Sequence, residues 1–150
     1  MIRRELTISQ IEKEPWIVWN SFVDLLAMED YDDLTSTQRV ASSLFWYDSE
    51  VQNGGHLQYF LNHGIEHVKT TLDALQSIGN NDFQDILTTA LNKYNSLDLK
   101  DIDDVEDYIE EALEDHFGEM DGRYYSVEPT IYSILQEYLE KNKNEFILIK

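Results

Sequence analysis

The segment from residue 98 to residue 121 concentrates side chains that could bind cations. Twelve of its residues are Asp or Glu, and one base, Lys100, opposes them. Many of the acids stand three or four residues apart, a spacing that places neighbouring carboxylates on the same side of a helix. Such a surface could coordinate a divalent cation through carboxylate oxygens or attract a basic macromolecule. The acidic residues are Asp98, Asp101, Asp103, Asp104, Glu106, Asp107, Glu110, Glu111, Glu114, Asp115, Glu119 and Asp121.

Magnesium coordination is the catalytic interpretation of this segment. In all-α phosphohydrolases, carboxylate pairs on facing helices hold Mg²⁺ against a phosphate. The pairs with suitable spacing are Asp103/Glu106, Asp107/Glu110 and Glu111/Glu114. An apolar stripe on the same helix is expected to face the core, however, and no second helix supplies a matching acid pair. We therefore expect neither a metal nor a cofactor and keep an Mg²⁺-dependent phosphohydrolase as an alternative. The stripe consists of Val105, Tyr108, Ile109, Ala112 and Leu113.

The charge of the segment favours a protein partner instead. Its net charge is −11, out of −19 for the whole chain. If the segment were helical throughout, it would be ~36 Å long and carry about one net charge per ~3.3 Å, against one per ~3.4 Å for each strand of duplex DNA. We therefore predict an acidic domain that mimics DNA and binds a basic DNA-binding protein, but binds neither nucleic acid nor membranes. Nearby acids expected to extend this surface are Glu29, Asp30, Asp32 and Asp33.

Two other interpretations of the acidic surface stay open. The protein could be a small interaction or immunity-type module whose basic partner does not bind DNA. The acids could also form a solvated surface without a partner. Competition with DNA for the partner separates the first of these from the DNA mimic.

Histidines offer a second metal-binding pattern. His63 and His67 are four residues apart, with Glu66 between them, and could face one ion from a helix. Gly64 is expected to break the helix inside that pair, and no third ligand is obvious, although His56 lies seven residues before His63. The chain contains no cysteine, no G-x-S-x-G motif and no P-loop. Nothing in the sequence requires an enzyme, and we predict none.

Two adjacent glycines, Gly54 and Gly55, stand beside a run rich in amides and aromatics. Adjacent glycines lose much conformational entropy on folding, so they mark a position that needs a positive φ or has no room for a Cβ. We predict a corner between two helices, with Gln58 and Asn62 bonding each other or nearby backbone. The motif is interpreted as scaffold, with binding of a small polar ligand as the alternative. Its residues are Asn53, Gly54, Gly55, Gln58, Tyr59, Phe60 and Asn62.

Apolar residues recur three and four positions apart along most of the chain, which predicts an all-α fold. The 150 residues suit one compact domain of about six or seven helices with short loops. Helices are expected to begin near Pro15, to span residues 35–53, to resume at Leu57, to cover residues 68–75, 83–94 and 103–117, and to begin again near Pro129. The terminal EFILIK is expected to be an extended tail or a continuation of the last helix.

The apolar runs are too short to cross a bilayer, and the N-terminus lacks the apolar region of a signal peptide. A cytoplasmic location is therefore predicted.

The glycine motif also resembles a known family. The order of its residues is similar to the NGG-x-x-Q-aromatic-aromatic-x-N box of the DMP-type DNA-mimic family, most members of which are catalogued as a domain of unknown function. The resemblance covers roughly residues 40–140 and departs from the family at His56, where an aromatic is usual, and at Asn80, where a small residue is usual. Further segments that look like the family's are Ala74-Leu75 with Ile78-Gly79, His116-Phe117, and the helix from Tyr132 to Tyr138.

The resemblance implies an all-helical domain that is often dimeric. It also implies that acidic side chains are presented as DNA phosphates to a transcriptional regulator, so that promoter binding is blocked. The contact acids of the family lie outside its box. The activity is therefore carried over to the acids of residues 98–121 through the charge argument alone.

Overall fold

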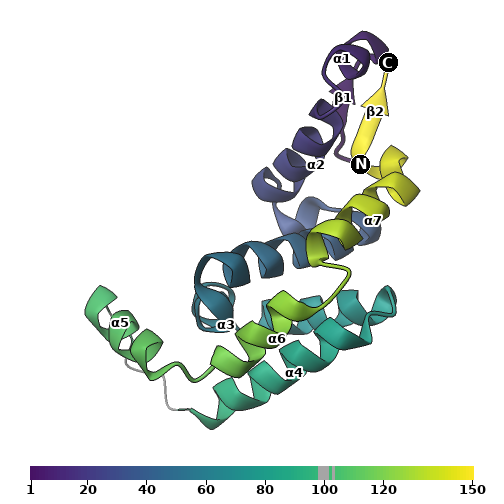
Figure 1. Ribbon diagram of the computed structural model, residues 1–150. Helices are drawn as coiled ribbons and strands as arrows, with labels where there is room; N and C mark the ends of the chain where they lie inside the picture. Colours follow the sequence, from purple (N-terminus) through teal and green to yellow (C-terminus); the bar gives the residue numbers. More distant parts are fainter. Residues whose placement is uncertain (98–101, 103) are drawn as a thin grey trace. The chain divides into compact units, whose positions relative to one another are not determined.

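The computed structural model describes residues 1–97, 102 and 104–150. This part of the chain forms seven α-helices, one 3₁₀ helix and two short strands (Figure 1). The predicted all-α class is confirmed. The chain divides into two compact units: unit 1 comprises Met1–Asp48 and Pro129–Lys150, and unit 2 comprises Ser49–Glu128. The single domain expected over residues 1–150 stays a prediction.

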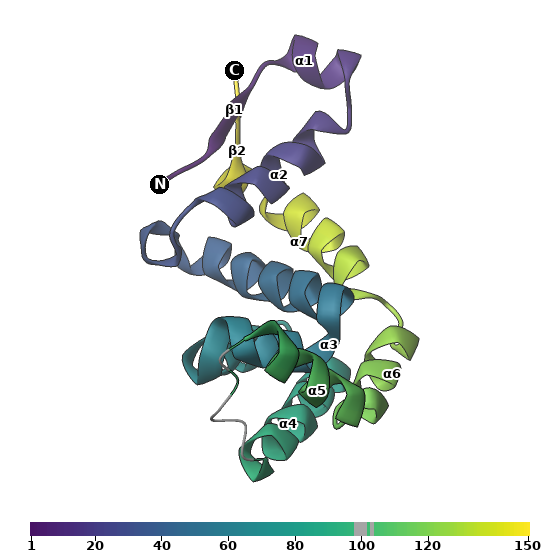
Figure 2. The same cartoon turned by 90° about the vertical axis from the view of Figure 1, so that its left-hand side faces the viewer.

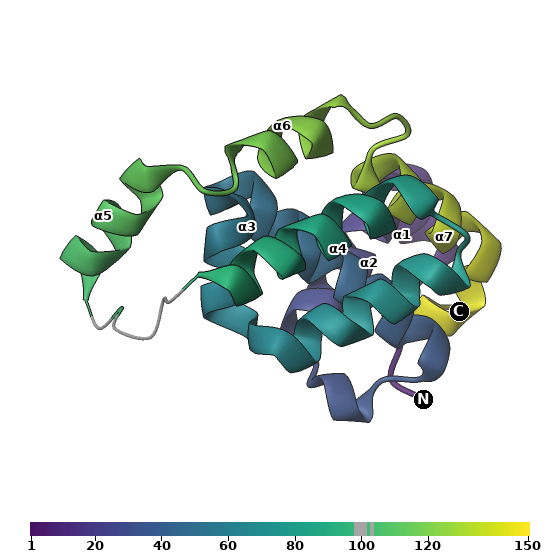
Figure 3. The same cartoon turned by 90° about the horizontal axis from the view of Figure 1, so that it is seen from below.

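The elements of the two units follow one another along the chain. Unit 1 contains β1 (Arg4–Leu6), α1 (Ile8–Lys13), α2 (Ile17–Met28), η1 (Tyr31–Asp33), the start of α3 (Ser36–Ser77), α7 (Ile131–Phe146) and β2 (Ile147–Ile149). Unit 2 contains the rest of α3 with α4 (Asn81–Ser96), α5 (Val105–Glu114) and α6 (Gly118–Ser126). Within unit 2, α4 and α6 pack against each other (Figure 3). Among the described helices, none has the length and hydropathy that a bilayer crossing requires.

The two ends of the chain form a parallel strand pair in unit 1, with residues 4–6 in register with residues 147–149 (Figure 2). Of the terminal EFILIK, which was expected to be an extended tail or a continuation of the last helix, Glu145 and Phe146 do continue α7, but residues 147–149 form a paired strand. Strands of three residues show little periodicity, and the partner lies at the other end of the chain, so no local pattern could reveal the pairing. Gln38, which is fully buried, supports the arrangement. Its amide nitrogen donates to the carbonyls of Ile2 at 2.6 Å and Glu145 at 2.7 Å.

Side chains cap the starts of α3 and α4. Thr35 Oγ1 accepts the Gln38 N–H at 3.2 Å, and Gln38 Oε1 accepts the Thr35 N–H at 3.0 Å, which completes a capping box at the start of α3. Asn80 Oδ1 accepts the Phe83 N–H at 3.0 Å at the start of α4. These bonds satisfy backbone donors that have no partner inside the helix.

Glycines bend α3 inside unit 2, as predicted. Gly54 has φ −153° and ψ 21°, Gly55 has φ 71°, and Gly64 has φ 75°. A Cβ on Gly54 would collide with the Gln58 side chain, and one on Gly55 would lie 2.5 Å from Asp121 Oδ2. The corner therefore requires glycine at position 55 for two reasons, a left-handed backbone and lack of space.

Substituting Gly55 by alanine should destabilise the protein by about 1–3 kcal/mol, because the new Cβ is strained at this φ and meets the Asp121 carboxylate. Gly122→Ala is the control, since Gly122 lies within α6 and a Cβ added there would have open space within 4 Å. That change should be neutral or stabilise the helix by up to ~1 kcal/mol. Urea unfolding of both variants measures the difference. Equal stabilities would show that the corner does not need its glycine.

Helix α5 differs from the sequence-based expectation in length and in burial. It ends at Glu114 instead of residue 117, because Asp115 adopts a left-handed conformation with φ 52° and ψ 41°. Its apolar stripe was expected to face the core, but Val105, Ile109 and Leu113 are 73%, 50% and 80% exposed, and that expectation was wrong. An amphipathic pattern shows which side chains share a face of a helix, whereas burial also needs a neighbouring element to cover that face.

Candidate functional site

The acids predicted to bind a partner do not share one helix. Asp98, Asp101 and Asp103 lie outside the described residues. Glu119 and Asp121 belong to α6, after the chain has turned at Asp115. The other seven form the α5 acidic surface: Asp104, Glu106, Asp107, Glu110, Glu111, Glu114 and Asp115.

The side chains of α5 fall into rows of residues four apart. The outer acidic row consists of Glu106, Glu110 and Glu114, all exposed and ~6 Å apart along the axis. The apolar row consists of Val105, Ile109 and Leu113. It lies beside the outer acidic row because Ile109 and Leu113 stand three residues after Glu106 and Glu110. The inner acidic row consists of Asp107, Glu111 and Asp115. Carboxylates and apolar side chains therefore occupy neighbouring strips of one short helix.

Bases are scarce in the segment of sequence that carries this surface. The sequence has no Lys or Arg between Lys100 and Arg123. Seven carboxylates over the ~16 Å from residue 104 to residue 115 give about one charge per ~2.4 Å, a density between that of one DNA strand and that of the duplex. Described ion pairs of Lys and Arg join Arg4 to Asp24 and Glu29, Arg123 to Asp85, Lys141 to Glu137, and Lys150 to Glu5. These pairs neutralise other acids than those of α5.

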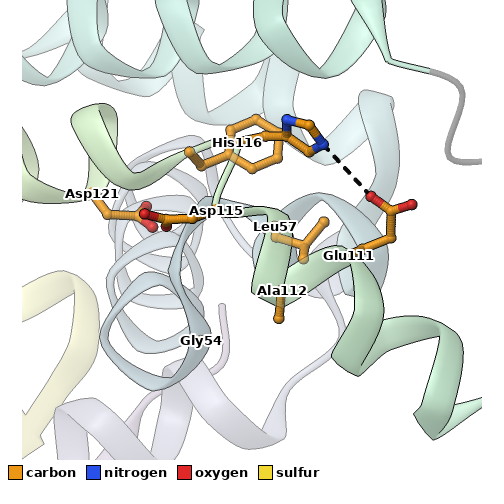
Figure 4. A pocket seen from close by; sticks show the side chains of 8 residues that line it. Gly54, Leu57, Glu111, Ala112, Asp115, His116 and Asp121 are labelled. Atoms are coloured by element: carbon orange, nitrogen blue, oxygen red, sulfur yellow. Dashed lines mark ion pairs between the residues drawn. The ribbon is translucent and has the colours of Figure 1, made fainter.

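Glu111 and Asp115 of the inner acidic row border a pocket of about 150 Å³ within unit 2 (Figure 4). Glu111 and His116 point toward each other there, with 3.9 Å between Glu111 Oε2 and His116 Nε2. No lysine or arginine lines the pocket, so its electrostatics are anionic. The lining residues are Gly54, Leu57, Glu111, Ala112, Asp115, His116, Phe117 and Asp121.

Asp121 differs from the other acids because it braces the glycine corner. Its Oδ1 accepts the backbone N–H of His56 at 2.9 Å and lies 2.6 Å from Nδ1 of the His56 ring. His56 is fully buried and its ring lies near Phe60 and Tyr124, with centroids 6.2 Å and 6.0 Å away. This carboxylate therefore holds a buried side chain and is itself only partly exposed.

The amides of the glycine motif converge on a residue that the sequence analysis did not single out, Glu50. Its Oε2 accepts from Gln58 Nε2 and Asn62 Nδ2, both at 2.8 Å, and its Oε1 lies 3.2 Å from His63 Nε2. Asn53 Nδ2 in turn donates to Gln58 Oε1 at 3.1 Å. Burial alone would raise the pKa of the Glu50 carboxyl, but the hydrogen bonds from Gln58, Asn62 and His63 outweigh it and lower the pKa below its ordinary value.

A network of polar side-chain contacts continues from this cluster through His63 and His67. The rings of His63 and His67 lie 4.5 Å apart between centroids, and His67 Nδ1 lies 2.9 Å from the Tyr59 hydroxyl. Tyr59 is fully buried, and its hydroxyl also lies 2.8 Å from Thr71 Oγ1. Burial raises the pKa of Tyr59. Burial, reinforced by the charge of His63 and opposed by Glu50, lowers the pKa of His67 to about 4.

These contacts favour a scaffold role for the motif, which remains a prediction. Nε2 of His63 faces Glu50, and Nδ1 of His67 faces the Tyr59 hydroxyl, so each of these ring nitrogens has a partner within the protein. Within residues 1–97, 102 and 104–150, no three His, Asp or Glu side chains form a metal-binding group. Gln58 and Asn62 were expected to bond each other or the backbone, and both bond Glu50 instead.

The low pKa of His67 predicts a pH-dependent stability. The unfolded chain takes up the proton near the ordinary pKa of 6.5 and the folded protein near 4. The contribution of the neutral ring is therefore complete above pH ~6.5 and is lost as the pH falls towards ~4. Over that range, the free energy of unfolding of the wild type should fall by on the order of 1–2 kcal/mol more than that of His67→Asn, after allowance for the ring's partial exposure.

Denaturant unfolding at a series of pH values measures this loss. His116→Asn is the matched control, since His116 is a partly exposed ring in the same unit. Parallel pH profiles of stability for the wild type and His67→Asn would show that folding does not lower the pKa of His67.

The other acids that were expected to extend the surface lie in unit 1. Glu29 pairs with Arg4, with 2.8 Å between Glu29 Oε1 and the guanidinium. Asp32 and Asp33 belong to the 3₁₀ helix η1, and Asp30 precedes it. These four residues belong to unit 1, whereas the α5 acidic surface belongs to unit 2.

Sequence reasoning missed the roles of Glu50 and His56 because both act across the corner. The non-helical glycines Gly54 and Gly55 separate Glu50 from Gln58, and 65 residues separate His56 from Asp121, so the periodicity of one continuous helix predicts neither contact. The position of His56 inside the glycine motif was the one available signal.

Comparison with known proteins gives one match. A family model described as DMP19-like protein matches residues 32–142, well over half of the chain. No curated protein and no solved structure matches the chain.

Proposed function

The chain belongs to the DMP19-like protein family, and from this membership we propose that it is an acidic protein-binding domain that acts as a DNA mimic. The α5 acidic surface occupies the DNA-binding face of a basic partner, such as a transcriptional regulator, and competes with DNA for it. The proposal includes no catalytic activity and places the protein in the cytoplasm. A homodimer is compatible with this function.

The observation that carries the proposal is the exposure of the outer acidic row on a helix without bases. Glu106, Glu110 and Glu114 point into solvent, and the seven carboxylates of the α5 acidic surface together have a charge density close to that of nucleic acid. Repulsion between carboxylates four apart costs about 0.2–0.5 kcal/mol per pair. A surface that served solubility alone would mix charges of both signs and avoid that cost. A basic partner offsets the cost when it neutralises the carboxylates.

Competition with DNA tests the proposal. The full-length protein serves as bait at low salt to isolate a DNA-binding partner from the native cytosol, and the purified partner is then titrated with duplex DNA in the presence of the protein. We expect DNA and the protein to exclude each other, with affinity that falls steeply as salt is raised. A ternary complex of partner, DNA and protein would refute the mimic. It would show that the protein binds its basic partner away from the DNA-binding face.

A further inference from the structure

The apolar row of α5 is exposed to an extent that the other long helices of the structure do not share. α2, α4, α6 and α7 each bury at least two side chains, whereas no residue of α5 is buried. Val105, Ile109 and Leu113 are 73%, 50% and 80% exposed. Because they stand four residues apart, they form a continuous apolar strip along the helix. A contiguous exposed strip of this kind is typical of an interaction surface.

The surrounding charges specify what can cover the strip. The outer acidic row runs along one side of it, and Asp104, the N-cap, lies at its start. A second copy of the chain would bring its own α5 acids against these, and with a net charge of −19 on each chain the two surfaces repel. An anionic membrane is disfavoured for the same reason. The complementary surface is a groove with an apolar floor and with lysines or arginines on its rim.

We propose that α5 docks as an amphipathic helix into such a groove, with Ile109 and Leu113 as its apolar anchors and the outer acidic row contacting the basic rim. This inference rests on the proposed function, since it takes the basic partner from there. It adds that recognition is not purely electrostatic. Interfaces commonly combine an apolar centre with a polar rim, and helix-in-groove recognition uses anchors spaced as these are.

Two synthetic helical peptides of equal length and equal positive charge provide the test. One carries leucines on one face and lysines elsewhere, and the other has glutamine in place of each leucine. The full-length protein should bind the leucine peptide at least about tenfold more tightly, and the preference should persist at high salt, because apolar contact is not screened. Fluorescence anisotropy of labelled peptides measures both affinities.

The double variant Ile109→Gln/Leu113→Gln should abolish the preference and leave binding of the glutamine peptide unchanged. Glutamine is a good helix former, and both positions are exposed, so the helix is retained. Met28→Gln is the control, since Met28 is 71% exposed but lies in α2 of unit 1. It should change neither affinity.

Two outcomes would overturn the inference. If the peptides bind equally well while replacement of the outer acidic row weakens both, α5 recognises charge alone, and the proposed DNA mimic still stands. If sedimentation shows a wild-type dimer that the double variant dissociates, the strip is covered by a second copy of the chain and not by a basic partner.

Discussion

Replacing Glu106, Glu110 and Glu114 together by glutamine is expected to weaken partner binding by roughly 10- to 100-fold and to leave the fold at least as stable. Each exposed carboxylate that meets a lysine or arginine contributes about 0.5–1 kcal/mol to binding. In the free protein the same three residues form two repulsive pairs four apart, each worth about 0.2–0.5 kcal/mol. Stability and affinity should therefore change in opposite directions. Calorimetric titration of the isolated partner, with thermal unfolding of the variant, measures both.

A control variant separates the position of the charges from their number. Glu12→Gln, Glu14→Gln and Glu140→Gln change three exposed glutamates of unit 1, so both triple variants raise the net charge of −19 by the same amount. The control should bind almost as tightly as the wild type. The loss in the α5 variant should also shrink as salt is raised, because screening weakens the same contacts. Equal losses in the two variants would show that the partner senses net charge, and no loss in either would refute the mimic.

The helical part of the fold could be predicted because its signals are local. The stripe of α4, the capping box at Thr35 and the corner at Gly54 and Gly55 each depend on residues within a few positions of one another. The strand pair of β1 and β2 joins the two ends of the chain, and no local pattern encodes such a contact. The exposure of the apolar row was unpredictable for the same reason, since it depends on which elements lie near α5.

The site was predictable in composition but not in geometry. The sequence shows how many acids lie between residues 98 and 121, yet the left-handed turn at Asp115 decides which of them share a helix. Asp residues tolerate that conformation, but sequence alone does not show where one adopts it. The convergence of Gln58 and Asn62 on Glu50 likewise depends on how the chain turns at the glycines. Charge density is therefore a property of the sequence, whereas the assignment of each acid to surface or scaffold needs coordinates.

Asp121 gives that assignment its sharpest test, because it lies in the acidic segment and yet contacts a buried side chain. Asp121→Ala should destabilise the protein by about 2–4 kcal/mol, and lower the melting temperature by about 5–15 °C. The variant removes the carboxylate oxygen that accepts the backbone N–H of His56 at 2.9 Å and lies 2.6 Å from its ring Nδ1. Both groups belong to His56, which is fully buried. Glu119→Ala is the control, because Glu119 lies in the same helix but is exposed. It should change stability by no more than ~0.5 kcal/mol.

A double-mutant cycle with His56→Phe shows whether the loss passes through the histidine. Phenylalanine keeps an aromatic ring against Phe60 and Tyr124 but makes no ring hydrogen bond to Asp121. In that background Asp121→Ala should cost less by about 1–3 kcal/mol, the coupling expected for residues in direct contact. Partner affinity, measured well below the melting temperature, should stay near the wild-type value in Asp121→Ala. A carboxylate that braces the corner contributes to binding only through the fold. A large loss of affinity in a folded Asp121→Ala protein, with no coupling to His56, would therefore show that Asp121 belongs to the binding surface.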